Sequence, residues 1–157
     1  MTNEKKQEFT RRISQANQSE LVVILYDLFF YYIDEAQQAL EKEGRKAFRV
    51  SLNRAHDCLN ELILSLHIET DLAKAIYQVY LFVSRKIGQA AGSCRAEELS
   101  DAVRLMRSLY ETYKTDAVHD TSEPVMNHSQ AVYAGLTYGR DCHHENQAAE
   151  ENRGFYA

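Results

Sequence analysis

The longest apolar run of the chain spans residues 21–33 and reads LVVILYDLFFYYI, with Asp27 as its one charged residue. On a helical period of 3.6 residues, its apolar side chains occupy two neighbouring faces. The first face holds Leu21, Leu25, Leu28, Tyr32 and Ala36, and the second holds Val22, Tyr26, Phe29, Phe30 and Ile33. The run is too short to cross a bilayer, which takes about 20 apolar residues. A helix that is apolar over this much of its circumference needs more than one burial partner, either within the chain or outside it.

Polar boundaries predict where this first helix begins and ends. Asn17 and Glu20 have the spacing of a capping box, and Gly44 can close a helix in the left-handed conformation. A second helix follows, with a coiled-coil-like seam at alternating intervals of four and three residues. The seam consists of Phe48, Leu52, Ala55, Leu59, Leu62 and Leu66.

Two more helices are expected after a change of pattern near Thr70 and Asp71, either of which could cap a helix. The third helix has a stripe of Leu72, Ile76, Val79, Val83, Ile87 and Ala90. The fourth follows Gly92-Ser93 and carries Leu99, Ala102, Val103, Met106, Leu109, Tyr110 and Tyr113. Four helices joined by short turns predict an all-α fold, an antiparallel up-down four-helix bundle over residues 17–115.

Both ends of the chain differ from this pattern. Residues 1–16 are polar, with Phe9 and Ile13 as apolar anchors, and predict either a frayed arm or a short helix over the body. Helical periodicity disappears from Thr115 onward, and residues 116–157 are predicted to form an acidic, largely disordered tail. Its one apolar patch consists of Val132, Tyr133, Leu136 and Tyr138.

Composition supports a single helical domain and narrows its partners. The 157 residues are 45% hydrophobic and include one proline and six glycines, too few turn residues for a β-rich fold. Seven acidic and two basic residues from Thr115 onward account for the whole net charge of −5. The neutral remainder lacks the basic stripe that nucleic-acid binding needs. Three widely spaced cysteines and no segment like a signal peptide predict a reducing cytoplasm.

The sequence offers little for catalysis. The Glu-x-x-His signature of di-metal bundles is absent, as are a nucleophile elbow, a glycine-rich phosphate loop and a Cys-x-x-Cys pair. Cys142-His143-His144 lacks the spacing of a metal site. We therefore predict no enzyme, no metal and no cofactor. Asp27 is either a carboxylate on the narrow solvent strip of the first helix, where an Arg or Lys of a neighbouring helix could pair with it, or a polar anchor at the rim of a partner groove.

Aromatic side chains gather on the first and third helices, beyond what one core stripe requires. They are Tyr26, Phe29, Phe30, Tyr31, Tyr32, Tyr77 and Tyr80. Such rings are enriched at interfaces, because each combines a large area with a polar handle. Two interpretations follow: a wide bundle core, or an exposed groove that takes an amphipathic helix of another protein.

Four stretches of the sequence resemble the flagellar secretion chaperones of the FliS family. They are SELVVILYD at 19–27, LNELILSL at 59–66, IYQVYLFVSRKI at 76–87 and LYETY at 109–113. The resemblance covers roughly residues 9 to 115. The chain departs from the family pattern by lacking a proline at the start of the first helix, by His67 in place of an aspartate and by Tyr113 in place of a tryptophan.

The resemblance implies a cytoplasmic chaperone that binds the C-terminal segment of flagellin, blocks its premature polymerisation and delivers it to the flagellar type III export gate. It also implies an N-terminal plug, for which Phe9 and Ile13 are the candidates. The resemblance predicts no insertion into a membrane. Together with the aromatic surface, it also predicts the residues that contact flagellin. These are Tyr26, Asp27, Phe29, Phe30, Ile33, Tyr77, Tyr80 and Leu81. The alternative is a self-associating structural or adaptor protein, and a weak homodimer without partner is compatible with both.

Overall fold

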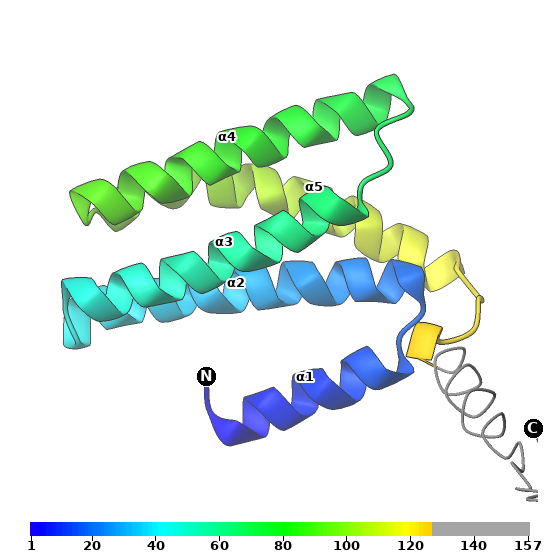
Figure 1. Ribbon diagram of the computed structural model, residues 1–157, viewed down its shortest axis with the longest axis horizontal. Coiled ribbons are helices and arrows are strands. Elements are labelled where there is room, and N and C mark those ends of the chain that lie inside the picture. The colour runs from blue at the N-terminus through cyan, green and yellow to red at the C-terminus, as the bar shows by residue number, and fades with distance from the viewer. Residues whose placement is uncertain (127–157) are drawn as a thin grey trace, which may run out of the picture.

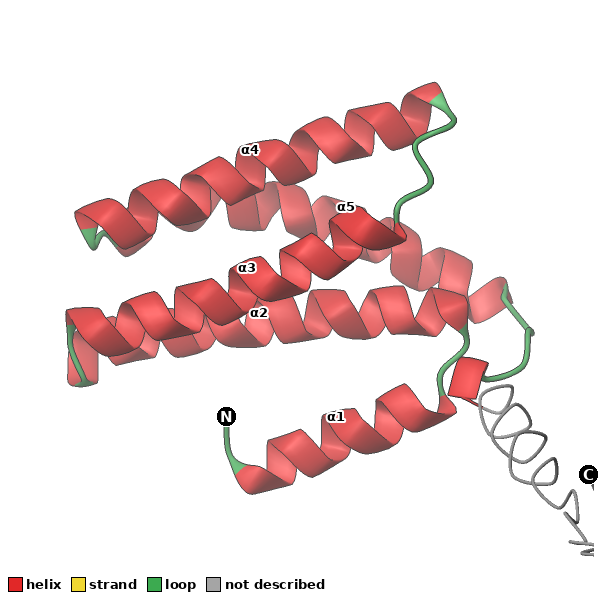
Figure 2. Cartoon of the chain, viewed as in Figure 1, coloured by secondary structure: helices red, strands yellow, loops and turns green. Residues whose placement is uncertain are grey.

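The computed structural model describes residues 1–126, which form helices and no strands (Figures 1 and 2). The helices are α1 (Asn3–Gln15), α2 (Gln18–Lys42), α3 (Arg45–Ser65), α4 (Asp71–Ser93), the short 3-10 helix η1 (Ala96–Leu99) and α5 (Ser100–His119). Most of the predicted tail, with its apolar patch and Cys142-His143-His144, lies outside this range.

Helices α2 to α5 form a four-helix bundle, as predicted. Helix α2 packs against α3 and α5, and α4 packs against the same two helices, so α2 and α4 lie at opposite corners (Figure 1). Helix α1 lies outside the bundle, along α2. The N-terminal residues are therefore the short covering helix of the two alternatives, and not a frayed arm.

Helix boundaries follow local chemistry. Asn17 and Glu20 form the predicted capping box, with hydrogen bonds of 2.8 and 3.0 Å in the two directions. Thr70 caps α4 by accepting from the backbone N–H of Ala73 at 3.1 Å. Gly44 has the predicted positive φ, but its φ of 90° and ψ of −175° differ from the left-handed helical region. This conformation is open almost only to glycine.

The core confirms most of the predicted stripes and corrects one. The predicted seam of α3 from Phe48 to Leu62 is buried, as are Leu99, Ala102 and Met106 of the last segment. In α4, however, Leu72 is 72% exposed, whereas Ala73 and Tyr80 are buried. The first turn of α4 diverges from the other helices (Figure 1), so its inward face is decided further along, by Tyr80 and Val83.

The last helix is longer than its pattern predicted. Helix α5 continues past Thr115 to His119, and the chain then turns back toward the connection between α1 and α2. The backbone N–H of Val125 donates to the carbonyl of Ala16 at 3.0 Å. Residues 116–126 are thus part of the folded structure, and residues 120–126 bring the chain to the N-terminal helix.

Candidate partner-binding surface

Four of the predicted contact residues lie in the core. Tyr26, Phe29, Ile33 and Tyr80 are between 0 and 2% exposed, so a partner cannot reach them while the bundle is closed. The hydroxyl oxygens of Tyr26 and Tyr80 are 2.7 Å apart and join α2 to α4 across the bundle. Burial raises the pKa of both hydroxyls, which keeps them neutral. Assigning these four to a surface groove was therefore wrong for the free chain.

Aromatic rings of α5 cover the ring-rich side of α2. The Tyr26 ring lies 5.6 Å from that of Tyr113 and 6.0 Å from that of Tyr110. The Phe30 ring meets Tyr110 edge-on at 5.7 Å, and the guanidinium of Arg107 lies 5.0 Å from the centre of the Phe30 ring. These distances are typical of favourable aromatic and cation–π pairs. The wide-core interpretation thus accounts for this side of α2.

The remaining predicted contacts do not share one groove. Phe30 is half-buried between α2 and α5, whereas Tyr77 and Leu81 lie at the surface of α4, Tyr77 half-buried and Leu81 37% exposed. A groove lined by both α2 and α4 was expected, but these helices occupy opposite corners of the bundle. The sequence pattern could not reveal this, since two amphipathic helices can be neighbours or diagonal partners.

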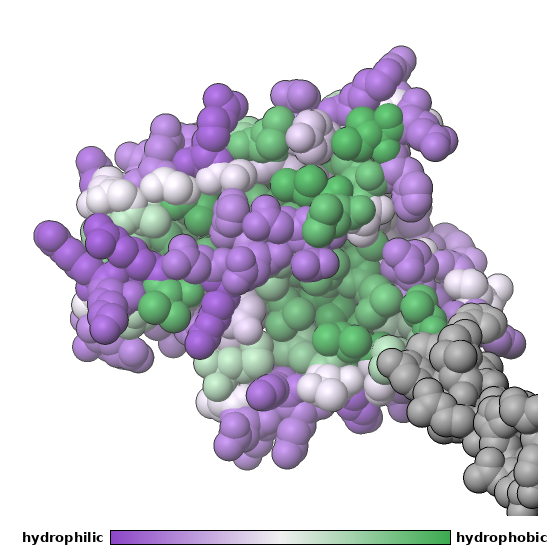
Figure 3. All heavy atoms as spheres, in the orientation of Figure 1, coloured by the Kyte–Doolittle hydropathy of each residue, from purple (hydrophilic) through white to green (hydrophobic). Residues whose placement is uncertain are grey.

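A different apolar surface remains on α2, between α1 and α3. We call it the α2 strip, and it consists of Leu21, Leu25, Leu28 and Tyr32, all half-buried. Leu28 contacts both the main core and the smaller cluster beneath α1. Figure 3 shows apolar side chains gathered on this face, between the polar outer surfaces of α1 and α3. These residues are the first of the two apolar faces that the sequence pattern identified.

Helix α1 covers one edge of the α2 strip through few contacts. Phe9 is 7% exposed and packs with Ile24, and its ring meets that of Tyr31 edge-on at 6.3 Å. The guanidinium of Arg12 donates to the carboxylate of Asp27 at 2.5 Å. Asp27 is therefore paired with a base of a neighbouring helix, as one of its two interpretations proposed. Of the two plug candidates, Phe9 is seated, whereas Ile13 is 36% exposed.

Glu35 ties the start of the chain to α2 and α3. Its carboxylate pairs with the N-terminal amino group of Met1 and accepts from the Ser51 hydroxyl at 3.0 Å. The guanidinium of Arg54 on α3 lies 3.6 Å from the same carboxylate. Partial burial alone would raise the pKa of Glu35, but these partners outweigh it and lower the pKa below the usual value. The sequence showed no signal for this contact, because its members are far apart in the chain.

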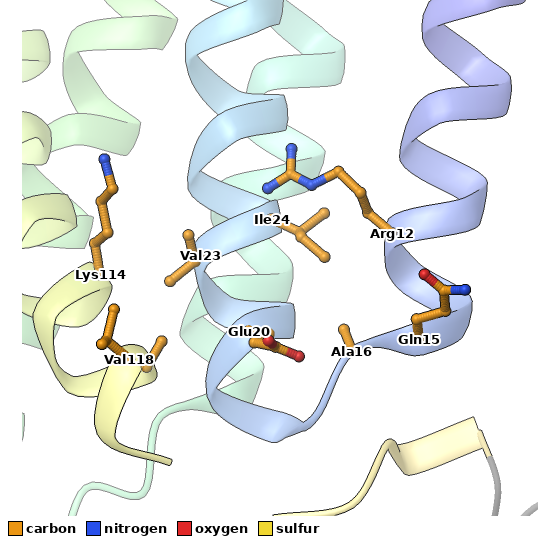
Figure 4. A pocket seen from close by; sticks show the side chains of 9 residues that line it. Arg12, Gln15, Ala16, Glu20, Val23, Ile24, Lys114 and Val118 are labelled. Atoms are coloured by element: carbon orange, nitrogen blue, oxygen red, sulfur yellow. The ribbon is translucent and has the colours of Figure 1, made fainter. Parts of the chain in front are cut away.

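Hollows border α1 at both ends. The hollow near its C-terminal end has a volume of about 510 Å³. Figure 4 shows Val23 and Ile24 of α2 between Arg12 of α1 and Lys114 and Val118 of α5. Two further hollows, of about 590 and 520 Å³, adjoin the residues that precede α1. The surface beside α1 and the residues before it is thus hollowed, and these hollows open to solvent.

These contacts set a modest limit on how firmly α1 is held. Burying a phenylalanine side chain stabilises by about 1.5–3 kcal/mol, and a partly exposed ion pair adds up to about 1 kcal/mol. A helix of 13 residues is itself marginal in water once it leaves its partner. A partner helix that buries two or three large apolar side chains on α2 could therefore replace α1.

Other polar groups serve the bundle. His56 bonds through Nε2 to the Ser84 hydroxyl at 2.9 Å and joins α3 to α4. Within residues 1–126, no group of three or more His, Cys, Asp or Glu side chains has the arrangement of a metal site. None of the helices in that range combines the length and apolarity that a bilayer crossing demands.

Comparison with protein families identifies the chain. The family model of the flagellar protein FliS matches residues 1–120. The chain belongs to the FliS family. This confirms the resemblance seen in the sequence, and FliS membership implies a flagellar export chaperone for flagellin instead of an enzyme. A comparison with curated proteins gives no match.

Proposed function

We propose that this FliS-family protein binds the C-terminal segment of flagellin in the cytoplasm, prevents its premature polymerisation and delivers it to the flagellar type III export gate. The α2 strip carries the proposal, because it is an apolar surface left partly exposed beside a weakly held helix. Contiguous exposed apolar surface on a monomer usually marks an interaction site. An amphipathic helix laid along α2 would bury it.

The mechanism we propose is coupled folding and binding with displacement of α1. A disordered flagellin segment forms a helix on the α2 strip, and its apolar side chains then take the place of Phe9 over Ile24. The ordering of the segment costs free energy, which burial of a large apolar area offsets. While no flagellin is bound, α1 shields part of the surface and limits aggregation.

Titration calorimetry of the full chain with a peptide of the C-terminal segment of flagellin from the same cell tests the proposal. We expect one-to-one binding with a large negative heat-capacity change, together with a gain of helix in circular dichroism. A folded protein that gives neither heat nor added helix would refute the chaperone assignment. If it also formed a dimer in sedimentation, self-association would be the better explanation of the α2 strip.

Two serine variants locate the binding surface. Leu21→Ser and Leu25→Ser should each weaken binding by roughly tenfold or more, because each removes a leucine that the flagellin helix would bury. Leu64→Ser is the matched control, since Leu64 is 77% exposed on α3 and outside the α2 strip. Equal affinities for all three variants and the wild type would place the binding surface elsewhere.

The plug and the α4 residues need separate tests. Phe9→Ala should tighten flagellin binding, because α1 then competes less for α2, whereas Ile13→Ala should change it little. Phe30, Tyr77 and Leu81 stay predicted contacts, and Tyr77→Asp should weaken binding without unfolding the protein if flagellin also reaches α4. Unchanged binding by a folded Tyr77→Asp variant would remove α4 from the proposed interface.

A further inference from the structure

The connection between α1 and α2 is held by a distant part of the chain. It consists of Ala16 and Asn17, which are 2% and 4% exposed. Residues 120–126, which follow α5 and which we call the strap, lie against it (Figure 2). The strap and the connection are separated by about 100 residues of sequence.

Asn17 has all its side-chain polar groups engaged only while the strap is in place. Its Oδ1 accepts from the backbone N–H of Glu20, which caps α2. Its Nδ2 donates to the carbonyl oxygens of Asp120 at 3.0 Å and Ser122 at 3.5 Å. Loss of the strap would leave this buried amide without acceptors, so the connection would have to open toward water.

Three further hydrogen bonds complete the strap. The Ser19 hydroxyl donates to the Asp120 carboxylate at 2.5 Å, and the backbone N–H of Ser122 donates to the same carboxylate at 3.0 Å. These bonds favour the ionised carboxylate and lower the pKa of Asp120 from 3.8 to about 2. The Val125 N–H bonds to the carbonyl of Ala16, the residue that ends α1. The strap thus contacts both ends of the connection between α1 and α2, which is the hinge about which α1 would move.

We propose that the strap is a latch that holds the α1–α2 hinge and thereby keeps α1 docked over the α2 strip. The regulatory role rests on the proposed function, in which α1 covers a flagellin-binding surface. Release of the strap frees the hinge, raises the fraction of molecules with α1 displaced and strengthens flagellin binding. Conversely, a partner that displaces α1 loosens the segment after α5, since linkage between two such events is reciprocal.

Hydrogen exchange of α1 in the full chain, without flagellin, tests the latch directly. Asn17→Asp keeps the cap, because aspartate caps as well as asparagine, but replaces the donor by a charge that faces two carbonyl oxygens. Val125→Pro removes the one N–H that donates to Ala16, and Val125→Ala is its matched control. In both test variants, α1 amides should exchange roughly tenfold faster, with α3 unchanged and the control like the wild type.

Unchanged exchange of α1 in both variants would overturn the latch. Equally faster exchange in α1 and α3 would also overturn it, because the strap would then stabilise the whole bundle. A second titration with the flagellin peptide separates the two proposals. If the variants bind the flagellin peptide more tightly, by the same factor by which α1 exchange is faster, both the latch and the flagellin function are supported. If α1 exchanges faster but the peptide does not bind, the flagellin function is refuted and the latch is retained.

Discussion

The hydroxyl pair of Tyr26 and Tyr80 provides a test of whether the aromatic residues belong to the core. Both side chains are at most 1% exposed, and their oxygens are 2.7 Å apart. Either Tyr→Phe change removes one hydroxyl and leaves the other buried with one partner fewer. The shape of the core stays nearly the same, so the measured effect reports on the polar pair.

The expected magnitudes follow from this geometry. A buried hydroxyl that loses its partner costs about 1–3 kcal/mol, so each single variant should lose stability within that range. The double variant Tyr26→Phe with Tyr80→Phe removes both polar groups and should cost less than the sum of the single changes, with a coupling of about 1–2 kcal/mol. Tyr77→Phe is the matched control on α4, and we expect it to stay within about 0.5 kcal/mol of the wild type.

Urea unfolding followed by circular dichroism gives the four free energies of this cycle, with the slopes checked for equality. Additive costs in the double variant would refute a direct interaction between the two hydroxyls. The same variants should bind flagellin as the wild type does, since neither hydroxyl is at the surface. A single variant of unchanged stability that lost flagellin binding would restore these tyrosines to the interface and refute our placement of the site.

Three other predictions concern the stability of the bundle. Gly88→Ala should stabilise the protein by about 0.5–1 kcal/mol, because the added Cβ meets no atom within 4 Å in α4. Gly44→Ala should destabilise it, because an alanine is strained at a φ of 90°. The urea midpoints of the two variants and the wild type measure both effects. Leu59→Ala should cost about 2–5 kcal/mol and Leu72→Ala under about 0.5 kcal/mol, since only Leu59 is buried. Burial raises the pKa of Cys58 from 9.0 to about 11. Between these pH values the folded state keeps the thiol proton that the unfolded chain loses, so the stability that Cys58 contributes is present below pH 9 and lost as pH rises toward 11. The urea midpoint of Cys58→Ala should therefore fall less between pH 9 and pH 11 than that of the wild type.

Helix boundaries could be predicted because the residues that form them act locally. The capping box of Asn17, the cap at Thr70 and the positive φ of Gly44 each depend on a few neighbouring atoms. The end of α5 lacked such a marker. Helix α5 ran on to His119, and the strap, through its contacts with Asn17 and Ser19, depends on residues that no local pattern relates.

Which face of a helix is inward depended on its neighbours. Helix α4 offers two apolar stripes, and the longer one, which begins at Leu72, was the wrong one at its start. Tyr80 lies inward on the face of Val83 and Ile87, and its hydroxyl meets that of Tyr26 on the diagonal helix. Periodicity measures how much of a helix is apolar, but it holds no information on which distant side chain meets which stripe.

The same distinction explains why the proposed site lies mainly on leucines and not on the aromatic residues of the core. Helix α2 is apolar around most of its circumference, and it has three neighbours, α3, α5 and α1. The rings of Tyr26 and Phe30 face α5, and the hydroxyl of Tyr26 meets that of Tyr80 on α4. Leu21 and Leu28 of the α2 strip adjoin the cluster beneath α1, a largely polar helix with one buried phenylalanine, and α1 leaves them half-buried. The weakest of the three neighbours therefore marks the surface that a stronger amphipathic helix would take.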